Sequence, residues 1–115
     1  MTKHITKIDK TSPTENGVIA PEKLIAGTAA TRTWNAFTNA RGNLHMGHWA
    51  SGPCKLNVNY TEDEFCMLIK GACILTDETG NATRFETGEP FAIASGFVGT
   101  WESVGDVEKI YVILE

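Results

Sequence analysis

The sequence lacks any long apolar run. No stretch approaches the roughly 20 residues that a membrane-spanning helix needs. Residues 1–10 contain lysines but are not followed by the apolar segment of about 7–15 residues that an export signal requires. We therefore expect a soluble, cytoplasmic protein with no membrane partner.

Positive charge is scarce as well. Ten Lys and Arg residues stand against 14 Asp and Glu residues, which gives a net charge of −4, and the two signs are intermixed over most of the chain. A protein that binds nucleic acid through its phosphates needs a clustered basic face. The composition therefore predicts no nucleic-acid partner.

Cysteine is rare, and its spacing has no pattern typical of a metal site. The three cysteines, Cys54, Cys66 and Cys73, form no CxxC pair. An odd number of cysteines in a chain without an export signal is typical of reduced thiols.

Helical periodicity is missing. No segment keeps it for the roughly 10–12 residues of a substantial helix. From Thr31 onward, short runs rich in β-branched and aromatic residues are separated by Gly, Pro, Asn or Asp. They predict strands at 33–38, 44–50, 55–60, 64–70, 72–76, 82–87, 90–93, 98–103 and 109–114, with a hairpin loop at 77–81. Strands of this length predict one all-β, antiparallel barrel or sandwich.

The chain has room for one domain, preceded by an arm. We assign residues 1–20 to an N-terminal arm, which has little apolar character beyond Ile5 and Ile8, and residues 21–115 to the barrel. The expected state of the arm is mobile or loosely docked, with docking on the barrel or on a partner subunit as alternatives. Proline at the start of residues 21–25 predicts one short helical turn.

The most informative stretch places polar side chains on inward faces. Alternate side chains of a strand share a face, so Val58 and Tyr60 point the same way, and Glu64, Cys66 and Leu68 share a face of the next strand. If both faces line one barrel, Tyr60 and Glu64 lie in the same cavity.

The spacing of this stretch resembles the first motif of the cupin superfamily. In that motif a Gly is followed by His-x-His, then Glu, then Gly. Gly52, Glu64 and Gly71 fall on the motif, with Val58 and Tyr60 at the two histidine positions.

The second cupin motif is also present in its spacing. Gly88 and Gly96 match it, whereas Ala94 replaces its proline, Gly99 its histidine and Ser103 its asparagine. The resemblance implies a cupin-type double-stranded β-helix, the RmlC-like jelly roll, from about residue 21 to the end. The stretches YTEDEFCMLIKG and GFVGTWE resemble more closely the small cupins related to the ureidoglycine aminohydrolase cupin domain.

The substitutions remove three of the four metal ligands that the resemblance implies. A carboxylate and a phenol alone hold a divalent ion poorly, so we predict no cofactor and leave open a divalent metal in a rebuilt site of Glu64, His45 and His48. The two histidines are three residues apart, which sends them to opposite faces of a strand. The simpler interpretation is one partly exposed strand histidine and one packed histidine.

Glu64 and Tyr60 are the candidate catalytic residues. In an apolar cavity Glu64 is suited to act as a base, a metal ligand or the partner of an amine, and Tyr60 to donate a hydrogen bond. The alternatives are a solvated glutamate at a strand start and a barrel-lining tyrosine with a satisfied hydroxyl.

Trp101 and Cys66 complete the predicted ligand-binding set with Tyr60 and Glu64. Trp101 lies two residues beyond Gly99 and so faces inward, where it lines the cavity, stacks on a planar ligand or packs in the core. Cys66 shares the face of Glu64, but an adjacent carboxylate raises a thiol pKa, so a buried, inert cysteine is favoured.

Two functions follow as hypotheses. One is a divergent cupin enzyme acting on a small nitrogenous or carboxylated metabolite through Glu64. The other is a non-catalytic module that binds a small molecule. The resemblance also implies a homodimer, for which the arm at Ile5 and Ile8 could supply a strand.

Overall fold

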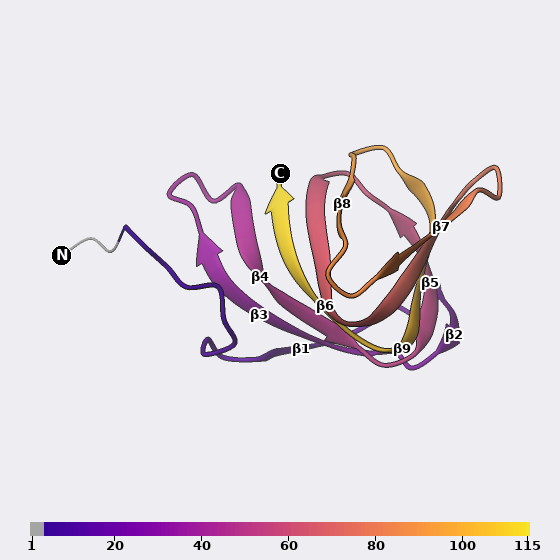
Figure 1. The fold of residues 1–115 in the computed structure, drawn as a ribbon, viewed down its shortest axis with the longest axis horizontal. Helices are drawn as coiled ribbons and strands as arrows, with labels where there is room; N and C mark the ends of the chain where they lie inside the picture. Colours follow the sequence, from indigo (N-terminus) through magenta and orange to yellow (C-terminus); the bar gives the residue numbers. More distant parts are fainter. Residues whose placement is uncertain (1–3) are drawn as a thin grey trace.

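The computed structural model describes residues 4–115. In this part of the chain all regular structure is β-strand, as predicted (Figure 1). The strands are β1 (Glu15–Val18), β2 (Leu24–Gly27), β3 (Ala30–Thr38), β4 (Leu44–Ser51), β5 (Cys54–Asn59), β6 (Asp63–Asp77), β7 (Ala82–Glu86), β8 (Pro90–Ile93) and β9 (Val98–Leu114). Within the described residues there is accordingly no helix long and apolar enough to cross a membrane.

Two long strands, β6 and β9, form the spine of the barrel. They pair antiparallel along almost their whole length. The C-terminal half of β9 continues the sheet to β4, β3 and β1, and its N-terminal half continues it to β5 and β2. Strands β8 and β7 pair with the two ends of β6. The curled sheet in Figure 1 is therefore one jelly-roll barrel.

Both spine strands bend at a glycine. Gly71 and Gly105 have φ angles of +80° and +75°, which side chains with a Cβ rarely adopt. Strand breaks were predicted at these places, and that prediction was wrong. The β6–β9 ladder shifts register near residue 70 and resumes at Ala72, so the glycines bend the strands instead of ending them.

Two short strands near the N-terminus were not predicted. Strand β1 lies inside the predicted arm and pairs with β3, and β2 pairs with β5. The expected helical turn is a hydrogen-bonded turn in which the Leu24 amide bonds the Ala20 carbonyl at 3.1 Å. The chain then enters β2, because the backbone groups of that segment find partners on the edge of β5.

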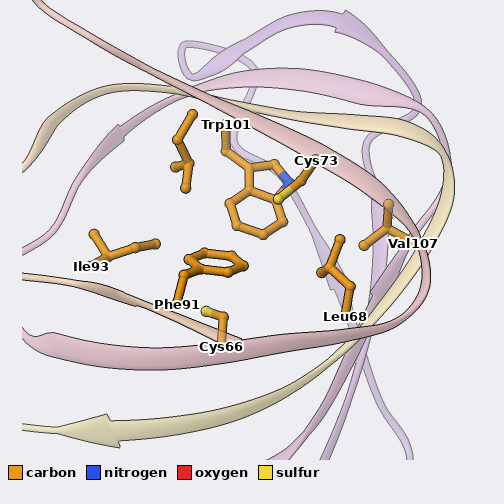
Figure 2. Close-up of a cluster of buried hydrophobic side chains, with 8 residues drawn as sticks. Cys66, Leu68, Cys73, Phe91, Ile93, Trp101 and Val107 are labelled. Atoms are coloured by element: carbon orange, nitrogen blue, oxygen red, sulfur yellow. The ribbon is translucent and has the colours of Figure 1, made fainter. Parts of the chain in front are cut away.

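The core fills one end of the barrel. Its fully or nearly fully buried members are Cys66, Leu68, Cys73, Leu75, Phe91, Ile93, Trp101 and Val107. Figure 2 shows the Phe91 ring between Cys66 and Trp101. Phe91 also stacks on Phe85 with ring centroids 3.9 Å apart. Trp101 marks the boundary of this core, because it is a core residue that also lines the pocket described below.

The arm is docked on the outer face of the sheet. The Lys10 ammonium lies 2.9 Å from a Glu108 oxygen, and the carbonyl of Ile8 lies 3.1 Å from Nε2 of His48. Trp34 is buried beneath this segment, with Lys10 over its ring.

Candidate functional site

The open end of the barrel contains a cavity of about 460 Å³, which we call the barrel pocket. Its walls come from strands β1, β3, β4, β5, β6 and β9, from the segment between β5 and β6, and from Glu115 after β9. The apolar and aromatic side chains of the wall are those of Trp49, Leu56, Val58, Tyr60, Trp101, Tyr111 and Ile113. Cavities of this size and lining are typical of small-molecule sites.

A buried ion pair lies at the bottom of the pocket. Glu64 and Cys66 point inward from β6, and Lys109 points inward from β9. The Lys109 Nζ lies 2.7 Å from Oε2 of Glu64, and the Cys66 thiol donates to the same oxygen at 3.0 Å. Only 8% of Glu64 and 7% of Lys109 is exposed. We call Glu64 and Lys109 the floor pair.

Lys109 is held as an ammonium ion. Burial alone lowers its pKa, but the acidic groups of Cys66, Glu64 and Tyr60 outweigh burial and raise the pKa above its ordinary value. At neutral pH the Glu64 carboxylate is the decisive partner, because the thiol and the phenol are then uncharged. The Lys109 Nζ also lies 4.6 Å from the ring centroid of Trp101 and 5.0 Å from that of Trp49. Such indole faces stabilise a desolvated cation.

Lys109 was missed in the sequence. The alternation of strand β9 could have indicated it, because Lys109 lies between the inward residues Val107 and Tyr111. In register, Lys109 pairs with Trp49 on one side and Leu68 on the other. Its meeting with Glu64 depends on that long-range register, which local sequence does not reveal.

Tyr60 lines the pocket with an unused hydroxyl. No hydrogen bond to this hydroxyl is found among residues 4–115, whereas the Tyr111 hydroxyl donates to Oδ1 of Asn35 at 2.8 Å. Burial raises the pKa of Tyr60 to about 12, with the positive charge of Lys109 opposing this and the negative charge of Glu64 adding to it. The phenol therefore stays protonated and can donate a hydrogen bond into the pocket.

Trp101 is fixed in position from behind. Its indole Nε1 donates to Oγ of Ser103 at 2.8 Å, and that oxygen lies 2.8 Å from Oγ of Ser51. The ring meets Trp49 edge to face, with centroids 5.9 Å apart. Both alternatives raised for Trp101, core and cavity wall, therefore describe its position.

Cys66 reaches the site through Glu64 and through Lys109, whose Nζ lies 3.7 Å from the Cys66 sulfur. It has no exposed surface and does not line the pocket. Burial raises the pKa of its thiol to about 12, with Lys109 opposing this and Glu64 adding to it. A thiol in this environment is a hydrogen-bond donor to Glu64 rather than a nucleophile.

The two histidines lie on opposite sides of the sheet. His45 lines the pocket mouth, where its Nε2 lies 2.7 Å from Oε1 of Glu115. His48 is on the outer face, with Nδ1 3.2 Å from Oε2 of Glu108. The structure therefore does not bring His45 and His48 together with Glu64.

The motif positions do not fit a divalent metal. Val58 has no donor atom, and Gly99 has no side chain. A Cβ at Gly99 would collide with the carbonyl oxygen of Thr76, so the strand pairing closes this position to any ligand side chain. Within residues 4–115, no three His, Cys, Asp or Glu side chains lie close enough together to hold a metal ion.

The remaining two donors are also unsuitable for a metal. Tyr60 is a protonated phenol, and Glu64 is bound to a permanent cation. A second cation at Glu64 would be repelled by the ammonium of Lys109.

Comparisons with known proteins give the same architecture. The family model of the EutQ-like cupin domain matches residues 38–111. None of the curated proteins compared with the chain matches it. A solved protein of unknown function from Pseudomonas syringae pv. tomato, of the DUF861 family, is 26% identical with a TM-score of 0.82, over 92% of this chain and 46% of that one.

Two further solved structures are similar in fold. The Clostridium difficile EutQ protein is 20% identical with a TM-score of 0.65, over 73% of this chain and 61% of that one. A cupin superfamily protein from Desulfitobacterium hafniense is 7% identical with a TM-score of 0.62, over 73% and 76%. This chain thus spans about half of the Pseudomonas protein. None of these matches is named as a ureidoglycine aminohydrolase, so that finer resemblance stays a prediction.

Proposed function

Because the chain belongs to the EutQ-like cupin domain family, we propose that it binds a small polar metabolite in the mouth of its barrel. One observation carries the proposal. The cavity of about 460 Å³ has aromatic walls that converge on the buried floor pair of Glu64 and Lys109. An apolar cavity with a few convergent polar groups is the usual form of a small-molecule site.

Two polar atoms of the pocket are available to a ligand. The Tyr60 hydroxyl is an unused donor. Both bonds to Glu64 go to Oε2, which leaves Oε1 as an acceptor. Because Tyr60 and Glu64 line the pocket and these two atoms have no partner within residues 4–115, we assign Tyr60 and Glu64 to ligand recognition and Trp101 to the wall on which the ligand packs. Cys66 supports the site by holding Glu64.

A second function, catalysis, is favoured by the environment of Glu64. The floor pair presents a carboxylate within an aromatic cavity, where a general base is shielded from water and fixed in orientation. In such an enzyme Glu64 removes a proton from the bound metabolite. Tyr60, as the donor, stabilises the negative charge that develops on it.

A metabolite screen tests the proposal. Thermal unfolding is recorded with amines, amides, alcohols and carboxylates of fewer than about 15 non-hydrogen atoms, since a ligand that binds only the folded state raises Tm. We expect at least one class to stabilise the wild type. Glu64→Gln and Tyr60→Phe should weaken the effect, and Glu78→Gln, in the exposed β6–β7 loop, should not. A screen without stabilisation, or with equal stabilisation of all variants, would contradict the proposal.

Mass spectrometry of the same mixtures separates the two functions. A binding module returns its ligand unchanged, whereas an enzyme yields a product that disappears with Glu64→Gln. The homodimer and the cytoplasmic location stay predictions. Sedimentation at micromolar concentration tests the first, and a single monomeric species would contradict it.

A further inference from the structure

The barrel pocket is rich in negative charge. Four carboxylates line it, those of Glu15, Glu62, Glu64 and Glu115. The positively charged or ionisable basic groups that line the pocket are the ammonium of Lys109 and the imidazole of His45. Four negative charges minus one positive charge leave −3 with His45 neutral and −2 with His45 protonated.

The positive charge in the pocket is already neutralised. Lys109 lies 2.7 Å from Glu64 and faces two indole rings, so a ligand anion would have to compete with an established carboxylate for it. At the mouth, Glu115 lies 2.7 Å from His45. Glu15 and Glu62, by contrast, form no ion pair within residues 4–115. The uncompensated charge is therefore negative and lies at the entrance.

The aromatic wall limits where a cation can lie. The indole faces of Trp49 and Trp101 already hold the ammonium of Lys109, so a second ammonium ion belongs at the entrance, beside the unpaired carboxylates. Tyr60, two residues before Glu62, brings a further aromatic ring and an unused hydroxyl to the pocket. Clefts lined by charge of one sign focus the field and attract ligands of the opposite sign.

We infer that the ligand of this pocket is a small organic amine, bound as an ammonium ion beside Glu62, one of the two carboxylates at the entrance that form no ion pair within residues 4–115. Its aromatic or aliphatic body lies against Tyr60 and Trp101. This inference rests on the proposed binding function and names the chemical class of the ligand.

Three small aromatic probes whose polar groups carry different charges test the inference. Benzylamine, benzyl alcohol and benzoate share one ring and carry an ammonium, a hydroxyl and a carboxylate. Binding is followed by NMR through the indole N–H signals of Trp49 and Trp101. We expect benzylamine to bind at least about tenfold more tightly than benzoate, and to lose affinity as salt is raised.

Charge-neutral variants assign the effect to residues. Glu62→Gln should weaken benzylamine about threefold or more and leave benzyl alcohol unchanged, and Glu78→Gln serves as the matched control outside the pocket. The inference would be overturned if benzoate bound as tightly as benzylamine or if benzylamine did not bind. It would also be overturned if Glu62→Gln left the affinity for benzylamine unchanged. In each of these cases, the proposed binding function would still be supported if benzyl alcohol or benzoate bound and shifted the Trp101 signal. A failed metabolite screen together with three inactive probes would overturn both.

Discussion

The Lys109 Nζ lies 2.7 Å from Oε2 of Glu64, with less than a tenth of either residue exposed. Removing one member of a buried pair leaves an uncompensated charge, which typically costs about 3–5 kcal/mol, whereas replacing both members is often neutral. We therefore expect Lys109→Met to destabilise the protein by that amount at pH 7. The double variant with Glu64→Gln should recover most of the loss in urea unfolding.

An exposed pair on the same barrel is the control. Arg84 and Glu86 lie 3.1 Å apart with side chains that are 51% and 57% exposed. Arg84→Met should cost no more than about 0.5 kcal/mol. The interpretation of the floor pair would be contradicted if Lys109→Met lowered the free energy of unfolding by less than about 1 kcal/mol. It would also be contradicted if the losses of the Glu64 and Lys109 single variants simply added in the double variant.

The two pocket tyrosines should respond differently to loss of the hydroxyl. Tyr111→Phe removes the bond to Asn35 and should cost about 1 kcal/mol. Tyr60→Phe removes no bond described in residues 4–115, so the free energy of unfolding should change by less than about 0.5 kcal/mol. Chemical denaturation measures both. A larger loss for Tyr60→Phe than for Tyr111→Phe would show that the Tyr60 hydroxyl has a structural partner.

The cysteines should be unreactive in the folded protein. With a pKa of about 12 for Cys66 and about 11 for Cys73, roughly one thiol in a thousand or fewer is ionised at pH 8. Cys54 is buried as well. We expect a disulfide reagent at pH 8 to label no thiol in water and three in denaturant. Rapid labelling of one thiol in the native state would contradict this expectation.

The arm contributes to stability in a pH-dependent way. Burial raises the pKa of Glu108, but the hydrogen bonds from Lys10 and His48 outweigh burial, and the net pKa is lowered. A lowered carboxyl pKa stabilises the fold above the unfolded value of about 4.3, and this stabilisation is lost as the pH falls through the lower folded value. Glu108→Gln should therefore reduce stability at pH 7 and flatten its decline below about pH 5. Thermal unfolding at several pH values measures this, and parallel curves for the two proteins would contradict it.

The donor set predicts no stoichiometric metal. Protein purified without chelator should contain only traces of zinc, iron, nickel or manganese by elemental analysis, and added zinc should not raise Tm. One metal ion per chain, lost with Glu64→Gln, would show that Glu64 leaves Lys109 to bind a metal.

Much of the fold could be predicted from local pattern. Alternation and turn residues placed most strands correctly, and the cupin resemblance, carried by the spacing around Glu64, is confirmed by the family match over residues 38–111. The pattern could not distinguish a strand that bends at Gly71 from one that ends there. Strand β1, with the sequence ENGV, has no alternation and exists because β3 offers it an edge.

The candidate site was predictable only in part. The alternation rule placed Tyr60, Glu64 and Trp101 on inward faces, and the structure brings them to one pocket. The rule says nothing about which residues of distant strands meet. Glu64 and Lys109 are 45 positions apart, and their contact follows from the register of β6 with β9.

The shared use of β9 by both halves of the barrel bears on how the protein folds. This strand pairs with β4, β5 and β6 and contributes both Trp101 and Lys109. Until β9 has been synthesised, Glu64 has no counterion and β4, β5 and β6 have no common neighbour. Barrels built on such distant pairings fold slowly, on the order of milliseconds to seconds. Closure of the barrel and assembly of the floor pair therefore depend on the same C-terminal strand.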